Sequence, residues 1–427
     1  AVYILITLLS ASCGNRSLKE ISLIELTIPE VQNYLLNGQI SCRSLVEGYL
    51  KRIEMYDESS GINAITVVNS QALNKAEIID QMIANGELLP DLFCVPVLVK
   101  DNFDTHDMVT SGGSITLVDN FPPDDAFMVH KLRKAGAIII AKTNMAEWAF
   151  SPRETVSSSF GRTANAYDIN YVPAGSSGGT ASGIAANFAI AGLGSDTGNS
   201  IRGPSSHLAL FGIRSTIGLT SRDGVIPLIF DRDIAGPMTR TVEDGARIFN
   251  VIAGHDSADP LSIPNMREDD YMEFLDINGL SGKRIGVLRA LVDHEDADEE
   301  INSLFTQALL DMESVGATII EGIKIHRFSD LENEIKSCSS FRYDLKRYLQ
   351  SLNTPPFLDM KILLDSGEYA PASEGGMEYF SQFPVDVNPE KRQDACQLWP
   401  HNILRNELLE NTLIAMAEAN LDALVYP

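Results

Sequence analysis

Short apolar runs alternate with amphipathic segments along the first half of the chain. The apolar runs predict buried strands at residues 65–68, 95–100 and 137–141. Between them, apolar side chains recur at helical spacing, which predicts helices over residues 72–85 and 125–135. This alternation indicates an α/β protein. We expect a mixed, mostly parallel, twisted central β-sheet flanked by α-helices on both faces.

The same alternation continues in the second half, but the pattern becomes more mixed beyond residue 336. Residues 353–387 are expected to be largely loop with short helices. The elements predicted around this segment are strands at 284–288 and 317–320, helices at 297–315, 341–352 and 401–419, and the start of a strand at 422–427.

Residues 172–237 are unusually rich in Gly and Ser. Glycine allows close approach of backbone to a ligand, and hydroxyl groups beside free N–H groups suit a site with a nucleophilic serine and an anion. Ser176 and Ser177 lie in the motif GSSGG, and Ser200 lies in GSDTGNSIR. An apolar run at 184–193, predicted as a buried helix leading into a strand, separates the two motifs. We therefore expect the two serine-bearing turns to face each other.

Lys100 closes the predicted buried strand 95–100. Burial of an ammonium group is costly and lowers its pKa, and a neutral amine can act as a general base. Taken alone, Lys100 would be a surface lysine at a strand end, and Ser176 would be an ordinary turn residue. The combination of Lys100 with the two serine motifs is what points to catalysis.

These three motifs together resemble the amidase signature family, serine hydrolases that cut carboxylic amides. The resemblance extends from about residue 26 to the end of the chain. It implies a Ser–cis-Ser–Lys triad. Ser200 would be the nucleophile, Ser176 the bridging serine after a cis peptide bond, and Lys100 the base.

The resemblance also implies an oxyanion hole made by the backbone N–H groups of Thr197, Gly198, Asn199 and Ser200. Each donor in such a hole typically contributes roughly 3–4 kcal/mol. Family members usually carry Gly-Gly before the nucleophile, where this chain has Gly198 and Asn199. Asn reaches the left-handed conformation readily and keeps its N–H, so the assignment stands.

Other residues receive supporting or bordering roles. Ser177 is expected to be a supporting hydroxyl, and Asp196 is expected to pair with Arg202 to hold the nucleophile loop. The resemblance places Ser111 and Gly112 in a loop that borders the substrate pocket. A plain turn is an equally good interpretation of these two residues.

The implied reaction is hydrolysis of a carboxylic amide to an acid and ammonia or amine through an acyl-Ser200 intermediate. The expected substrate is a small molecule or a peptide with a linear amide outside the peptide backbone, such as a C-terminal amide. Two alternatives stay open. One is the amidase subunit of a tRNA-dependent amidotransferase, which works with a cytoplasmic partner, and the other is an inactive amide-binding relative. No cofactor is implied.

Composition narrows the remaining classes. The formal net charge of −25 argues against a nucleic-acid-binding surface. The seven His show no metal-binding spacing, and the five scattered Cys, with no CxxC, argue against a disulfide framework or a zinc site. The glycine spacing matches neither the dinucleotide fingerprint nor the P-loop.

Residues 1–13 resemble the end of a bacterial lipoprotein signal peptide, with Cys13 as the lipidated residue. We expect an incomplete signal segment there, followed by one catalytic domain over residues 24–427 that lacks its C-terminal part. The protein would then be exported to the periplasm or outer surface and touch the membrane only through the lipid. The alternative is a buried N-terminal segment in a cytoplasmic protein. The sequence sets no oligomeric state.

Overall fold

The computed structural model describes residues 21–293, 296–335, 339–392 and 398–427. The expected signal segment and Cys13 lie outside these residues. None of the helices in the described ranges combines the length and the apolarity needed to cross a bilayer.

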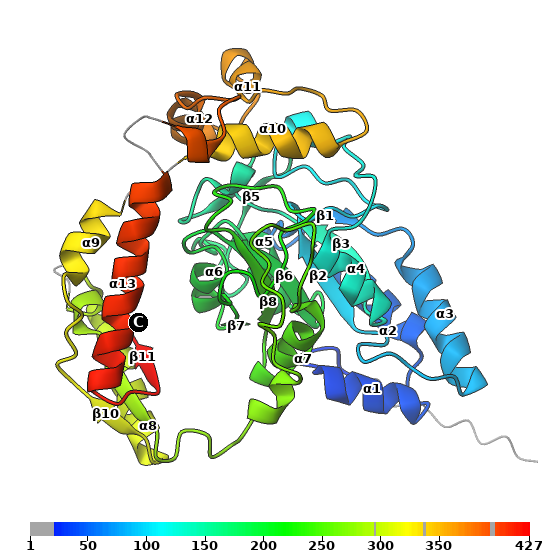
Figure 1. Ribbon diagram of the computed structural model, residues 1–427. Helices are drawn as coiled ribbons and strands as arrows, with labels where there is room; N and C mark the ends of the chain where they lie inside the picture. Colours follow the sequence, from blue (N-terminus) through cyan, green and yellow to red (C-terminus); the bar gives the residue numbers. More distant parts are fainter. Residues whose placement is uncertain (1–20, 294–295, 336–338, 393–397) are drawn as a thin grey trace, which may run out of the picture.

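Six strands form the central sheet in the order β1-β3-β2-β6-β8-β7 (Figure 1). β3 and β6 both run parallel to β2, while β1, β8 and β7 each pair antiparallel with their neighbours. The expected mixed α/β sheet is confirmed, with a larger antiparallel share than expected. The bounds are β1 (Ile65–Val68), β2 (Pro96–Lys100), β3 (Ile138–Thr143), β6 (Ala191–Asp196), β7 (Phe211–Gly212) and β8 (Ile234–Thr239).

The connections between strands explain this share. A helix, α4, links β2 to β3 and supplies the crossover that a parallel pair requires, whereas only a loop links β7 to β8. The helices of this part of the chain are α1 (Ile28–Leu36), α2 (Cys42–Tyr56), α3 (Ala72–Asn85), α4 (Phe127–Lys134), α5 (Gly178–Ala185), α6 (Arg202–His207) and α7 (Val242–Ile252).

Helices α5 and α7 cover opposite faces of the sheet. A Cβ atom on Gly192 of β6 would lie 2.5 Å from Thr180 of α5, so this face packs directly against that helix. A Cβ atom on Gly245 of α7 would lie 3.0 Å from Thr239, which pairs with Ala191. Because neighbouring residues of a strand point to opposite faces, Gly192 and Ala191 place the two helices on different sides.

Helix α5 begins earlier than the apolar run at 184–193 predicts, because it starts directly after Ser177. Glycine is a poor helix former, but a Cβ atom on Gly178 would lie 2.3 Å from Thr155, and one on Gly179 would lie 2.2 Å from a carbonyl oxygen of Asn144. Tertiary packing therefore overrides helix propensity here. The result is that Ser176 and Ser177 lie at the start of a buried helix.

The second half adds a small parallel sheet and a group of helices at the top of Figure 1. Tyr348 donates a hydrogen bond to Asp104 (2.7 Å), and the N–H of Ala370 donates to Glu147 (2.7 Å), which ties this helical cap to the central sheet. The bounds are β4 (Thr155–Ser157), β5 (Gly161–Thr163), β9 (Arg284–Val287), β10 (Thr318–Ile320), β11 (Ala423–Val425), α8 (Glu299–Ser314), α9 (Phe328–Glu334), α10 (Phe341–Ser351), α11 (Lys361–Ser366), α12 (Glu374–Ser381) and α13 (Leu398–Glu418).

Cys42 and Cys94 form a disulfide, so the expectation that the scattered cysteines form none is wrong. Both side chains are fully buried in the core, although 52 positions separate them in sequence. Helix α2 and the segment that leads into β2 pack together, and this contact is not visible in cysteine spacing.

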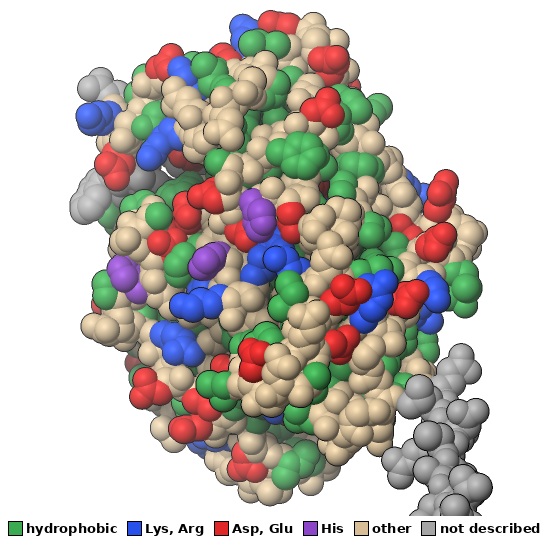
Figure 2. Space-filling model, turned by 90° about the vertical axis from the view of Figure 1, so that its right-hand side faces the viewer, with side chains coloured by type: hydrophobic (Ala, Val, Ile, Leu, Met, Phe, Trp, Pro, Cys, Tyr) green, Lys and Arg blue, Asp and Glu red, His purple; other side chains and the backbone are tan. Residues whose placement is uncertain are grey.

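One face of the molecule carries acidic and basic side chains interspersed, with hydrophobic side chains scattered between them (Figure 2). Single apolar residues on a surface are ordinary and mark no interaction site. The functional features of the chain therefore have to be sought in its buried polar groups.

Candidate active site

Lys100 ends strand β2, as predicted, and its side chain is 0% exposed. Its Nζ atom lies 2.7 Å from Oγ of Ser176 and 2.8 Å from Oγ of Ser195. Burial lowers the pKa of Lys100 to about 7, against the opposing charges of Asp196 and Asp233. A lysine with this pKa is partly neutral at physiological pH, which is the state that a general base requires.

Ser176 follows a cis peptide bond from Gly175, as the family resemblance implies. The Ser176 side chain is fully buried, and its carbonyl oxygen accepts a hydrogen bond from the N–H of Ala146 (3.1 Å). A Cβ atom on Gly175 would lie 2.4 Å from a carbonyl oxygen of Glu154. Glycine is therefore required before the bridging serine, because the neighbouring chain leaves no room for a side chain.

Ser200 lies between β6 and α6 and is 6% exposed. The side chain of Asn199 donates to the carbonyl oxygens of Pro152 (3.1 Å) and Gly175 (3.4 Å), so the two serine-bearing turns meet as predicted. Among the hydrogen bonds of the described residues, none joins Ser176 to Ser200. Catalytic hydrogen bonds often tighten only when substrate binds.

The backbone of the nucleophile loop leaves donors available. Within the described ranges, the N–H groups of residues 197–200 donate to no protein acceptor. The loop is fixed through other groups, because the Thr197 hydroxyl donates to Asp233 and the N–H of Ile201 donates to Asp196 (3.1 Å). Consecutive free N–H groups beside a serine are what an oxyanion hole needs.

Asp196 pairs with Arg202, which confirms the expected contact. Its carboxylate is fully buried and lies 3.1 Å from Nε of Arg202 and 3.1 Å from Nη1 of Arg214. Burial alone would raise the pKa of Asp196, but the hydrogen bond and charge of Arg202 bring it below its ordinary value. The ion pair holds both ends of the loop that carries Ser200.

Ser195 and Asn102 belong to the site, although the sequence did not suggest them. The Ser195 hydroxyl accepts hydrogen bonds from Lys100 and from the Asn102 side chain (2.9 Å). The Ser177 hydroxyl donates to the Ser195 carbonyl oxygen (3.2 Å), so Ser177 supports this network. Asn102 lies two residues after Lys100 and Ser195 directly precedes Asp196, and these positions were the available signal.

Ser111 and Gly112 are both buried. The Ser111 hydroxyl donates to Asp101, and the N–H of Gly112 donates to the Asp101 carbonyl oxygen (3.0 Å). Lys142, a second buried lysine that the sequence did not single out, lies 3.6 Å from the same carboxylate. These contacts favour the turn interpretation, because the Ser111 hydroxyl is already bonded within the protein.

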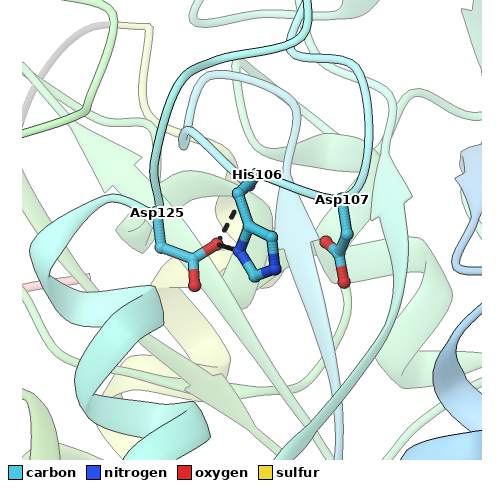
Figure 3. Close-up of side chains that lie close together, drawn as sticks. All are labelled: His106, Asp107 and Asp125. Carbon is cyan, nitrogen blue, oxygen red and sulfur yellow. Dashed lines mark hydrogen bonds and ion pairs between the residues drawn. The ribbon is translucent and has the colours of Figure 1, made fainter.

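His106, Asp107 and Asp125 are the only group of potential metal ligands among the described residues (Figure 3). Arg133 lies between the two carboxylates, 2.6 Å from Asp107 and 3.0 Å from Asp125. Asn69 donates to the other oxygen of Asp107 (3.0 Å), and His106 contacts the other oxygen of Asp125 (2.9 Å). All four carboxylate oxygens thus have partners, and the group is an ion-pair cluster rather than a metal site.

A model of the Amidase family matches residues 44–427. The chain belongs to the amidase family. The family fold is shared with a native peptide amidase from Stenotrophomonas maltophilia, at a TM-score of 0.82 and 31% identity over 94% of this chain and 83% of that chain. An amidase family protein from Bacillus anthracis matches at a TM-score of 0.81 and 28% identity over 94% and 80% of the two chains.

Curated relatives include an amidase-family subunit of the glutamyl-tRNA(Gln) amidotransferase from Alkaliphilus metalliredigens, 40% identical over 70% of this chain. The corresponding protein from Prochlorococcus marinus is 37% identical over 71% of this chain. The alignments span 60% and 62% of the length of these two relatives. Membership of the amidase family is therefore clear, while the individual activity has to be argued from the site.

Proposed function

We propose that this chain hydrolyses a carboxylic amide through an acyl-Ser200 intermediate. The observation that carries the proposal is the 2.7 Å contact between Nζ of Lys100 and Oγ of Ser176, in a location without solvent, at a lysine whose pKa is lowered to about 7. A neutral amine bonded to a buried hydroxyl is a proton relay that lacks only the nucleophile. Ser200 lies in the loop that meets Ser176 through Asn199.

The reaction then proceeds by acyl transfer. Neutral Lys100 accepts the proton of Ser176, which accepts the proton of Ser200 as the Ser200 oxygen attacks the amide carbonyl. The N–H groups of residues 197–200 stabilise the oxyanion. The relay returns the proton to the departing amine, and water attacks the acyl-enzyme to release the acid and restore the Ser200 hydroxyl.

The substrate class in this proposal is a linear amide outside the peptide backbone, including the C-terminal amide of a peptide. The likeness to the Stenotrophomonas maltophilia peptide amidase supports this choice. A related structure of the peptide amidase PAM holds the competitive inhibitor chymostatin, and it matches 94% of this chain at 31% identity.

We further propose that the protein is exported, with lipid on Cys13. The Cys42–Cys94 disulfide supports export, because disulfides persist in oxidising compartments and are rare in the cytosol. Fractionation of the native host, followed by immunoblotting, should find the protein in the membrane fraction facing the periplasm or exterior. Recovery from the cytosol with residues 1–13 intact would refute this proposal.

The amidase component of a tRNA-dependent amidotransferase is the second candidate, and it is favoured by the 40% identity to such a protein. The disulfide argues against it, since this candidate would work with a partner in the cytoplasm. The third interpretation, an inactive relative, conflicts with the bonded Lys100–Ser176 pair.

Ammonia release from aliphatic, aryl and C-terminal peptide amides tests the proposal. Wild-type protein should hydrolyse at least one class of amide, Ser200→Ala should abolish the release, and Ser206→Ala, an exposed serine on α6, should leave it unchanged. Equal ammonia release by wild type and Ser200→Ala would refute the assignment.

A further inference from the structure

A cavity of about 370 Å³ lies between helix α10 and the loops that follow β2 and precede β8. Its volume is in the range of sites for small molecules. Asp344, Arg347, Tyr348 and Ser351 line it from α10, where residues three and four positions apart share one face. Asp104 lines the opposite wall. The cavity thus lies where the helical cap meets the sheet that carries Lys100.

Two buried carboxylates face this cavity. Asp104 accepts a hydrogen bond from Tyr348, and Asp344 is 9% exposed. Within the described residues, Oδ2 of Asp344 is buried and has no hydrogen-bond partner. Burial raises the pKa of Asp104 and that of Asp344 to about 7. A buried carboxylate oxygen without a partner is costly when ionised, and a bound cation would remove that cost.

The arginines at the cavity leave this negative charge largely uncompensated. Arg222 is committed to Asp259, which it contacts through two nitrogens. Arg347 is exposed on α10, and its charge acts on Asp344 against that of Asp233. The remaining wall is partly apolar, because Val225, Pro227, Phe230 and Pro260 also line the cavity.

We propose that this cavity binds the ammonium or guanidinium group of a small organic cation with an aliphatic stem. The carboxylates of Asp104 and Asp344 would hold the charged group, and the apolar wall would contact the stem. A bare metal ion fits less well, since the cavity is much larger than an ion and much of its wall offers no ligand atom.

The cavity is adjacent to the proposed active site. It shares Arg222 and Val225 with a small cavity of about 10 Å³ that Ser195 and Thr197 line. The bound cation can therefore be the basic end of an amide substrate, which rests on the proposed function, or a separate amine. Both sources have the same chemistry at the cavity.

Calorimetric titration of the whole protein with butylguanidinium and with the uncharged butylurea tests the binding. We expect saturable binding of butylguanidinium, at least about tenfold tighter than butylurea. Asp344→Asn should weaken butylguanidinium binding about tenfold, while Asp365→Asn, an exposed acid on α11, should not change it. Equal affinity for the two ligands in wild type would overturn the proposal, whether or not Asp344→Asn folds.

Hydrolysis assays with arginine amide and norleucine amide then identify the source of the cation. If the substrate supplies it, Asp344→Asn should raise KM for arginine amide alone, and butylguanidinium should inhibit competitively. If a separate amine supplies it, butylguanidinium binds without competing. Failure to hydrolyse any amide would remove the proposed function but leave the calorimetric result standing.

Discussion

The side-chain amide of Asn199 donates to the carbonyl oxygen of Gly175 at 3.4 Å. This bond joins the residue before the proposed nucleophile to the residue before the bridging serine. Family members usually have glycine at position 199, so a side-chain contact here is a departure of this chain. Asn199 therefore positions Ser200 relative to Ser176, in addition to offering its backbone N–H to the oxyanion.

Replacement of Asn199 by Ala should lower kcat about tenfold. The change removes two hydrogen bonds, to Pro152 and Gly175, each worth about 1 kcal/mol, but it keeps the backbone donor. Steady-state kinetics of amide hydrolysis measure the effect, with Asn170→Ala, an exposed asparagine, as the control. A wild-type kcat for Asn199→Ala would show that the contact does not position the nucleophile.

The rate of hydrolysis should rise with pH through about 7. Lys100 in the folded protein has a pKa lowered to about 7, so its neutral, proton-accepting form increases from pH 5 to pH 9 and then saturates. A profile of kcat/KM against pH reports this pKa for the free enzyme. Lys100→Arg should lose roughly 10²–10⁴-fold in rate, because a guanidinium stays protonated. A flat profile over this range contradicts the role of Lys100.

Asp196→Asn should destabilise the fold by about 3–5 kcal/mol, because removing one partner of a buried ion pair leaves the other charge uncompensated. Urea unfolding followed by circular dichroism measures the loss. The matched control is Glu321→Gln, which breaks a half-exposed pair with Arg289 and should cost less than about 1 kcal/mol. Similar losses for both variants would mean that Asp196 does not anchor the nucleophile loop.

Reduction of the Cys42–Cys94 disulfide should lower the unfolding temperature. The bond closes a loop with a sequence separation of 52 residues, and such cross-links typically contribute about 2–4 kcal/mol. Thermal unfolding with and without reductant, together with alkylation and peptide mass spectrometry, measures the effect. Peptides with Cys42 and Cys94 should stay unmodified until the protein is reduced, and alkylation of both in the native oxidised protein would contradict the bond.

Much of the fold could be predicted from the hydrophobic pattern. Helices α2 and α3 and strands β1, β2 and β9 lie within a residue or two of their predicted bounds, because their periodicity is local. Strands β7 and β8 were not predicted, since their pairing depends on a loop return that leaves no regular pattern. The Cys42–Cys94 bond was missed for the same reason, because only tertiary packing brings the two residues together.

The candidate site divides in a similar way. Lys100, Ser176 and Ser200 could be proposed because each lies in a motif with a recognisable composition. Ser195 could not, because a serine inside a predicted strand has no signal of its own until its neighbours are placed. The same holds for Asp344, whose meaning depends on the cavity that α10 forms with distant loops.

The most direct test of the central claim is covalent labelling of the intact protein with a serine-reactive fluorophosphonate, followed by peptide mass spectrometry. The relay from Lys100 through Ser176 predicts a single adduct on Ser200, absent from Ser200→Ala and strongly reduced in Lys100→Met. An adduct on another serine, or no adduct on an active preparation, would contradict the account.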